Sequence, residues 1–333
     1  MYYQDKLESI SEIFRGREIT LNEGEVVVDS CRYPIVDDVI IALNPAKYPE
    51  SLKRRLGIST TFEVSDARSF DADIQYTFGA EWQKFNSVLP EHSREFEQYF
   101  DLVDVSALKN QRVCDLGCGI GRWSYFLRDR VKELVLVDFS EAIFEARRNL
   151  GDRNNVLFVM ADIKDLPFRS DFADLVFCLG VLHHLPTNAL DEVRALKQYA
   201  PMVLIYLYYG LDNRPIYFQW LLACATRLRY GLAKLKARHA RGVLTDLLTW
   251  TVYVPMVALG RAVKPLGLQS YVPLYDGYHD KTIKRVRQDV YDRFFTTIEQ
   301  RFSKKEIVQL KDTYASVEIS GQLPYWHFLC RRK

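Results

Sequence analysis

A glycine-rich loop with an acidic residue at its start carries the clearest chemistry in this sequence of 333 residues. The loop reads Asp115-Leu-Gly117-Cys118-Gly119-Ile-Gly121 and follows a short apolar run. Glycines let a backbone approach a ligand closely, and the start of the helix expected after them favours a carboxylate or a phosphate. The negative charge of Asp115, at the start of the same loop, suits an ammonium group. A ligand that carries both charges side by side is an amino acid.

Two further acids stand where the next expected strands end. Asp138 follows Asp115 by 23 residues, at the position from which a carboxylate can accept hydrogen bonds from both hydroxyls of a ribose. Asp162, after the third strand, could accept a hydrogen bond from the amino group of adenine. Amino acid, ribose and adenine in that order describe S-adenosylmethionine. We expect this cofactor and no metal.

Two other interpretations of the loop remain open. The NAD fingerprint G-x-G-x-x-G would place its third glycine at Arg122, and Asp115 would face a pyrophosphate unfavourably. The second alternative is a glycine-rich turn that binds no ligand.

Alternating strands and helices surround these residues. We expect strands at 112–116, 133–137, 156–160, 172–179 and 202–208, and helices at 121–129, 141–149 and 189–198. A capping-box pattern predicts a helix over 303–312, and two last strands, 316–319 and 326–330, would pair antiparallel. This order predicts an α/β fold, a doubly wound sheet with helices on both faces.

Changes of pattern along the chain predict five segments. We expect a small β-rich domain at 1–50, a linker and covering segment at 51–110, the cofactor-binding core at 111–210, a helical insertion at 211–300 and the rest of the core at 301–333.

Composition limits the classes of protein. Lys and Arg number 45 and Asp and Glu 43, so a net charge of +2 argues against a chain that binds polyanions over its whole length. The N-terminus lacks the basic and apolar stretches of a secretory signal, so we expect a cytoplasmic protein. Residues 243–260 come nearest to a membrane span, but Asp246, three threonines and Pro255 interrupt them, and we expect no true span.

Residues 111–208 resemble the class I S-adenosylmethionine-dependent methyltransferases, in the broad group that includes ubiquinone-biosynthesis methyltransferases. The segments 113–122, 134–140, 159–163 and 174–185 carry the resemblance. It implies a seven-stranded Rossmann-like sheet with an antiparallel C-terminal strand, and S-adenosylhomocysteine as a product. It also implies cofactor contacts by Asp115, Gly117, Cys118, Gly119, Gly121, Asp138, Phe139, Ala161, Asp162, Ile163 and Leu179.

Two flanking segments resemble parts of relatives in sugar and secondary-metabolite pathways. Residues 78–85 are similar to a segment that closes over the cofactor, which adds Trp82 to the expected contacts. Residues 33–38 resemble a small β-rich domain that often binds zinc. Only Cys31 is present there, so a zinc role is not supported.

Candidate catalytic residues depend on the acceptor. Methyl transfer relies mainly on alignment, but a hydroxyl acceptor usually needs a general base. The first candidates are His183 and His184, which follow the fourth strand, and the alternative for them is a packing motif. The second candidates are Asp276 and His279, with Tyr275, Tyr278 and Arg293 as acceptor contacts, and the alternative there is an exposed polar turn.

The stretch 213–245 contains seven Lys and Arg and no acid, with leucines at helical spacing. Three interpretations remain open: an amphipathic cap over the active site, a helix on an anionic membrane surface, or a site for RNA or another polyanion. Against RNA, the basic residues lack interleaved aromatic side chains for base stacking.

These features predict an S-adenosylmethionine-dependent methyltransferase that acts on a small molecule or a glycan, with oxygen as the methylated atom. A lipid-linked acceptor would place the protein at the inner face of the membrane, with peripheral contact through residues 213–260. The alternatives are an RNA methyltransferase and a catalytically silent scaffold that binds the cofactor.

Overall fold

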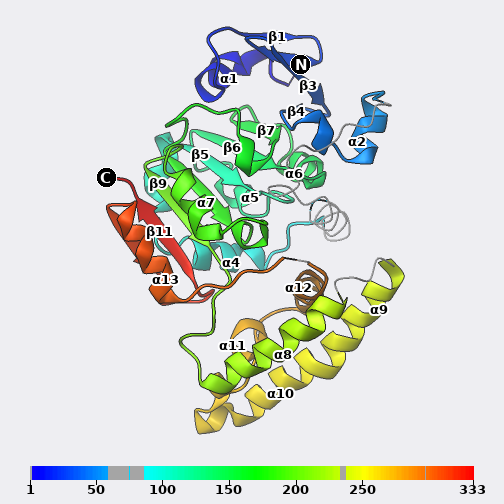
Figure 1. Cartoon of the computed structure of the whole chain (residues 1–333), viewed down its shortest axis with the longest axis vertical. Coiled ribbons are helices and arrows are strands. Elements are labelled where there is room, and N and C mark those ends of the chain that lie inside the picture. The colour runs from blue at the N-terminus through cyan, green and yellow to red at the C-terminus, as the bar shows by residue number, and fades with distance from the viewer. Residues whose placement is uncertain (1, 59–74, 76–85, 233–237, 297) are drawn as a thin grey trace. The chain divides into compact units, whose positions relative to one another are not determined.

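The structure is a computed structural model that describes residues 2–58, 75, 86–232, 238–296 and 298–333. The chain divides into two compact units (Figure 1). The core unit comprises Met1–Leu207 and Lys305–Lys333, and the insertion unit comprises Tyr208–Lys304.

Eleven strands form the sheet of the core unit within the described residues, in the order β1-β2-β3-β4-β7-β6-β5-β8-β9-β11-β10. Their bounds are β1 (Ile19–Asn22), β2 (Glu25–Val28), β3 (Cys31–Val36), β4 (Val39–Ile41), β5 (Arg112–Leu116), β6 (Glu133–Asp138), β7 (Val156–Met160), β8 (Leu175–Leu179), β9 (Met202–Tyr206), β10 (Ser316–Ile319) and β11 (His327–Arg331).

The predicted fold class is confirmed by the part of the sheet from β7 to β10. Strands β5 to β9 pair in parallel, whereas β11 is antiparallel to both β9 and β10. The chain runs from β5 outward to β6 and β7, and then returns to the other side of β5 as β8. The strand order therefore reverses between β5 and β8, which is where open α/β sheets bind ligands.

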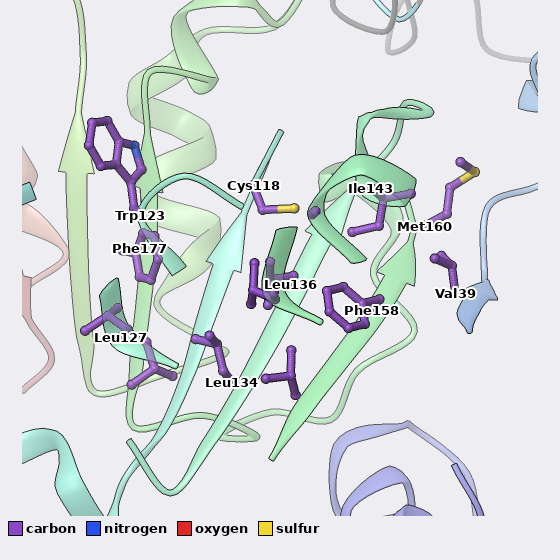
Figure 2. Packing of buried hydrophobic residues seen from close by; sticks show 14 of the residues in the cluster. Val39, Cys118, Trp123, Leu127, Leu134, Leu136, Ile143, Phe158, Met160 and Phe177 are labelled. Atoms are coloured by element: carbon purple, nitrogen blue, oxygen red, sulfur yellow. The ribbon is translucent and has the colours of Figure 1, made fainter. Parts of the chain in front are cut away.

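The central strands are buried on both faces, as parallel strands between helices must be. Side chains two residues apart share one face, so Leu134 and Leu136 of β6 line up with Phe158 of β7 in one apolar layer (Figure 2). Leu127 and Ile143, from the helices that cover this face, complete the layer.

Helices of the core unit are α1 (Leu7–Ile13), α2 (Glu50–Arg55), α4 (His92–Tyr99), α5 (Ser124–Leu127), α6 (Ala142–Leu150), α7 (Ala189–Leu196) and α13 (Lys304–Val308). Helices α6, α7 and α13 lie where the sequence predicts helices, α1, α2 and α4 were not predicted, and the helix expected at 121–129 is only α5. Gly121 has a φ of +72°, outside the helical region, so the helix begins three residues later. A single turn carries little of the macrodipole that was expected there.

The N-terminal segment is β-rich, as predicted, but it continues the central sheet. Ile40 and Ile41 of β4 pair in parallel with Val159 and Met160 of β7. Helix α2 lies in the stretch expected to be a linker, and its Leu52 belongs to the core. The predicted segment boundaries stay predictions.

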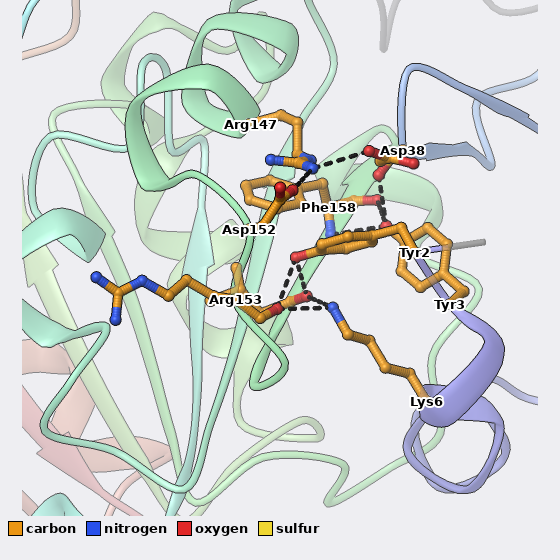
Figure 3. A network of polar contacts seen from close by, with 9 residues as sticks. Tyr2, Tyr3, Lys6, Asp38, Arg147, Asp152, Arg153 and Phe158 are labelled. Atoms are coloured by element: carbon orange, nitrogen blue, oxygen red, sulfur yellow. Dashed lines mark hydrogen bonds and ion pairs between the residues drawn. The ribbon is translucent and has the colours of Figure 1, made fainter.

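A polar network ties the first residues to the turn before β7 (Figure 3). Lys6 Nζ and the Tyr2 hydroxyl both donate to the backbone carbonyls of Arg153 and Val156, at 2.8–2.9 Å. The buried Tyr3 hydroxyl donates to the carbonyl of Asp38 at 2.7 Å and accepts from the Phe158 N–H at 3.2 Å.

The insertion unit is helical, as predicted. It contains α8 (Ile216–Leu232), α9 (Arg238–Leu248), the π-helical turn η6 (Thr249–Tyr253), α10 (Val254–Val263), α11 (Tyr275–Tyr278) and α12 (Ile283–Phe295). One continuous helix in the described chain, His239–Leu266, is long and apolar enough to cross a bilayer by length and composition alone. At the base of the unit, Phe302 donates its N–H to the Tyr208 carbonyl and accepts from the Gly210 N–H.

The network in Figure 3 yields a stability prediction for Tyr3→Phe. The change leaves the buried Phe158 N–H without its hydroxyl partner, so we expect unfolding to become easier by about 1–3 kcal/mol. Urea denaturation measures this, with Tyr271→Phe as a control at a 56% exposed side chain, where a change below about 0.5 kcal/mol is expected. Equal midpoints for the two variants would contradict the prediction.

Candidate functional site

The glycine loop after β5 has a backbone that larger residues could not adopt. Gly117 has a φ of +74°, and a Cβ atom there would lie 2.5 Å from a methyl carbon of Val181, just after β8. The loop therefore lies tightly against the segment after β8, at the point where the strand order reverses.

Asp115 lies near the end of β5, and its side chain is almost completely buried. Its Oδ2 atom accepts a hydrogen bond from the Ser124 hydroxyl at 2.7 Å. Burial raises the pKa of this carboxyl from 3.8 to about 8, because the charged form loses its hydration. A cation placed against Asp115 would favour the ionised form again.

Asp138, the last residue of β6, links the glycine loop to the next turn. Its Oδ2 atom accepts from the Gly119 N–H at 2.9 Å, and Oδ1 accepts from the Ser140 N–H and hydroxyl at 2.8 and 2.6 Å. Burial raises the pKa of this carboxyl. A carboxylate has about four acceptor positions, so these neighbours already occupy most of the positions that the sequence analysis assigned to the ribose hydroxyls.

Asp162 follows β7 and is paired with a lysine from the N-terminal segment. Lys47 Nζ donates to its Oδ2 atom at 2.7 Å, and the Lys164 N–H donates to Oδ1 at 2.9 Å. The buried Gln75 donates to the carbonyls of Lys47 and Phe139 at 3.1 and 2.6 Å. Side chains from two distant segments thus meet at the ends of β6 and β7.

The remaining predicted cofactor contacts lie along the same edge of the sheet. Cys118 and Ala161 are buried, whereas Phe139, Ile163 and Leu179 are partly exposed. The Ala161 N–H donates to the Asp138 carbonyl at 3.1 Å, which holds the two strand ends together. Trp82 lies outside the described residues.

His183 and His184 lie on the short helix η5 (Leu182–His184), directly after β8. Both rings are buried, with centroids 4.2 Å apart, and the His183 ring lies 6.2 Å from that of Tyr206. The position matches the expected edge of the sheet, and the base role stays a prediction.

The other predicted catalytic residues belong to the insertion unit. Asp276 forms an ion pair with Arg214 at 2.6 Å, and the His279 ring stacks on Tyr275 with centroids 4.8 Å apart. Both side chains thus have partners within the insertion unit, and their catalytic roles stay predictions. Arg293 lies 5.6 Å from the centroid of the buried Tyr278 ring.

Sequence reasoning did not find Lys47, Gln75, Ser124 or Ser140. Lys47 lies 115 residues before Asp162 and in a segment expected to be separate, so no local pattern signals the pair. Ser124 is within reach of sequence reasoning, since it is a small polar residue one turn after the loop. In the described residues, His, Cys, Asp and Glu side chains form no cluster that could hold a metal ion.

A family model described as a methyltransferase domain matches residues 113–199. These residues contain the loop, the ends of β5 to β8, and all three acids. The chain carries a class I S-adenosylmethionine-dependent methyltransferase domain. The resemblance noted in the sequence is confirmed.

Individual relatives match only part of this chain. The chain is 25% identical over 133 residues to the tRNA U34 carboxymethyltransferase of Trichodesmium erythraeum, covering 39% of this chain and 36% of that protein. It is 38% identical over 97 residues to the demethylmenaquinone methyltransferase of Clavibacter sepedonicus, covering 28% and 40%. The chain thus spans less than half the length of these relatives. A solved structure, an S-adenosylmethionine-dependent methyltransferase from Aquifex aeolicus, matches with a TM-score of 0.32 and 22% identity, covering 38% of this chain and 71% of that one.

The residues of the methyltransferase domain fit S-adenosylmethionine. Asp115 is a buried carboxyl that a cation would ionise, Asp138 places a second buried carboxyl at the next strand end, and the loop is too tight at Gly117 for any side chain. The ammonium group of the cofactor suits Asp115 and its ribose hydroxyls suit Asp138, while the bare backbone at Gly117 permits a close approach.

The raised pKa of Asp115 makes a prediction for Asp115→Asn. The pKa of Asp115 is 3.8 in the unfolded chain and about 8 in the folded protein. At pH values between the two, the folded wild type therefore holds a proton on Asp115 that the unfolded chain has released. Stability of the wild type therefore falls as the pH rises through this window, and the neutral variant escapes the loss. We expect the free variant to gain up to about 4 kcal/mol over the wild type between pH 5 and pH 8.

Urea denaturation at pH 5, 6, 7 and 8 measures this difference. Calorimetry with S-adenosylhomocysteine should show that the same variant binds the ligand much more weakly. Parallel stability profiles for the two proteins would contradict the raised pKa.

Proposed function

We propose that the chain methylates a small molecule or a glycan on oxygen, with S-adenosylmethionine as the donor. The arrangement of Asp115, Asp138 and Asp162 at successive strand ends supports this proposal most directly. When bound, the cofactor supplies an activated methyl group.

The residues of the chain would position the donor and manage charge. Asp115 would pair with the ammonium group, and Asp138 would accept from the ribose. Asp162 would accept a hydrogen bond from the amino group of adenine, while Lys47 Nζ donates to its Oδ2 atom. His183 or His184, and Asp276 or His279, are the candidate bases for a hydroxyl acceptor.

An RNA acceptor is a second candidate, because tRNA U34 carboxymethyltransferases are among the relatives. A demethylmenaquinone methyltransferase is also among the relatives, so these matches favour no acceptor by themselves. Filter binding to bulk tRNA over a range of salt concentrations tests this candidate, because phosphate contacts give a steep salt dependence.

A labelled-donor experiment tests the proposed function. The purified protein is incubated with methyl-labelled S-adenosylmethionine and a metabolite extract, and labelled products are identified by mass spectrometry. A labelled methyl ether supports the proposal. Label only in RNA, or no transfer to any fraction despite cofactor binding, would overturn it in favour of the second candidate or of a silent scaffold.

Asp138→Ala should weaken the binding of S-adenosylhomocysteine by about 2 kcal/mol, the scale of one charge-assisted hydrogen bond. Calorimetry measures the loss, with Asp165→Ala as a control at an exposed acid after β7. Since Asp138 also holds Gly119 and Ser140, a thermal melt should accompany the titration. Unchanged affinity in the folded variant would remove Asp138 from the site.

His279→Ala should lower turnover and leave affinity for S-adenosylhomocysteine intact, because His279 belongs to the expected acceptor site. The control is His239→Ala, an exposed histidine of the same unit. Rates equal to those of the control with the identified acceptor would contradict the role.

A further inference from the structure

We propose that the insertion unit docks on an anionic lipid bilayer through an apolar face formed by α8 and by the helix His239–Leu266. The apolar face consists of Ile216, Tyr217, Trp220, Leu221, Leu228, Tyr230, Val243, Leu247, Trp250, Val252, Leu259 and Leu266. Every one of these side chains is exposed. The inference goes beyond the proposed function, because it concerns a surface that the chemistry does not need.

The apolar exposure is concentrated in one unit. Of the seventeen large apolar side chains that are exposed in the described chain, all but Leu7 and Val308 belong to the insertion unit. Trp220 and Trp250 are 67% and 58% exposed. Single exposed apolar residues are common on soluble proteins, but a face of this extent marks contact with a partner or a membrane.

The inner sides of the two helices bury polar side chains together with apolar ones such as Phe218, Tyr253 and Val257. On His239–Leu266 the buried positions include Arg241, Thr245 and Thr249, spaced four residues apart. The hydroxyls of both threonines donate to the carbonyl four residues earlier, at 2.7 Å, which satisfies them without water. On α8, the buried Arg229 pairs with Glu299 at 3.3 Å. Surface helices of water-soluble proteins present a polar outer side, whereas these two helices present large apolar side chains there.

Helix α12 indicates that the helices lie on the membrane surface. It packs against α8, α9 and η6, and it carries six charged residues: Lys284, Arg285, Arg287, Asp289, Asp292 and Arg293. Asp246, the one acid of His239–Leu266, pairs with Arg287 at 2.6 Å. A spanning arrangement would draw these charges into hydrocarbon, whereas a helix pair in the interface keeps α12 in water.

Charge selects an anionic bilayer as the occupant. The insertion unit has sixteen Lys and Arg against seven Asp and Glu, a net charge of +9, whereas the rest of the chain has 29 against 36, a net charge of −7. Arg227 on α8, and Arg261 and Lys264 near the end of the long helix, are exposed beside the apolar face. A second copy would oppose two positive surfaces, but anionic headgroups, as on the cytoplasmic leaflet, attract them.

Co-sedimentation with vesicles tests the docking. The full chain is mixed with vesicles of phosphatidylcholine alone and of phosphatidylcholine with 30% phosphatidylglycerol, at low and high salt. We expect binding to the anionic vesicles, weakened by salt. Vesicles that carry brominated acyl chains should quench the fluorescence of Trp220 and Trp250, and the quenching should fall in Trp220→Phe and Trp250→Phe.

Matched variants locate the surface. Trp220→Glu and Trp250→Glu each remove an apolar anchor and add repulsion, so the partition coefficient should fall on the order of tenfold. The control is Val308→Glu, which adds the same charge at an exposed apolar residue of the core unit. This variant should bind the vesicles as the wild type does. Calorimetry with S-adenosylhomocysteine should be unchanged in all three, so failure of docking and failure of the cofactor site are distinguishable.

Three results would overturn the proposal. The first is no binding to anionic vesicles at low salt by a folded chain that binds S-adenosylhomocysteine. The second is equal vesicle binding by Trp220→Glu, Trp250→Glu and the wild type. The third is that the chain does not bind vesicles but forms a dimer in light scattering, or an RNA complex in filter binding, and that the Trp→Glu changes abolish this association.

Discussion

A carboxyl group buried at the end of the central strand is the constraint on which the site depends. Asp115 is nearly inaccessible and has one hydroxyl partner, so its ionised form is unstable in the free protein. The surrounding structure holds it there: β6 and β8 flank β5, and the tight turn at Gly117 closes over the strand end. A cation bound beside Asp115 would offset the lost hydration, and in its absence the ionised carboxyl costs the folded protein stability.

The central sheet and its acids could be predicted because their signals are local. Each strand of the methyltransferase domain is a short apolar run, and each acid lies where such a run ends, so parallel pairing brings Asp115, Asp138 and Asp162 to one edge. The helix after the loop was predicted too long because apolar periodicity does not register the positive φ of Gly121.

Long-range pairings could not be predicted in the same way. The pairing of β4 with β7 and the ion pair of Lys47 with Asp162 join residues more than a hundred positions apart. For the insertion unit, leucine spacing indicates a helix with two faces, but it does not say which face meets water. Leu221 and Leu228 point outward because Arg229 and Phe218 take the inner positions.

The hydrogen bonds between Phe302 and both Tyr208 and Gly210 close the insertion unit at its base. The segment leaves the sheet after β9 and returns before β10, so its two ends are fastened to each other and behave as a single anchored loop. These hydrogen bonds help to offset the entropy that is lost when so long a loop is closed. That entropic cost rises only slowly with the length of the loop. Replacing the segment between these two ends with another closed module would leave the order of the strands intact. The junction is therefore a site at which modules of different specificity can be exchanged.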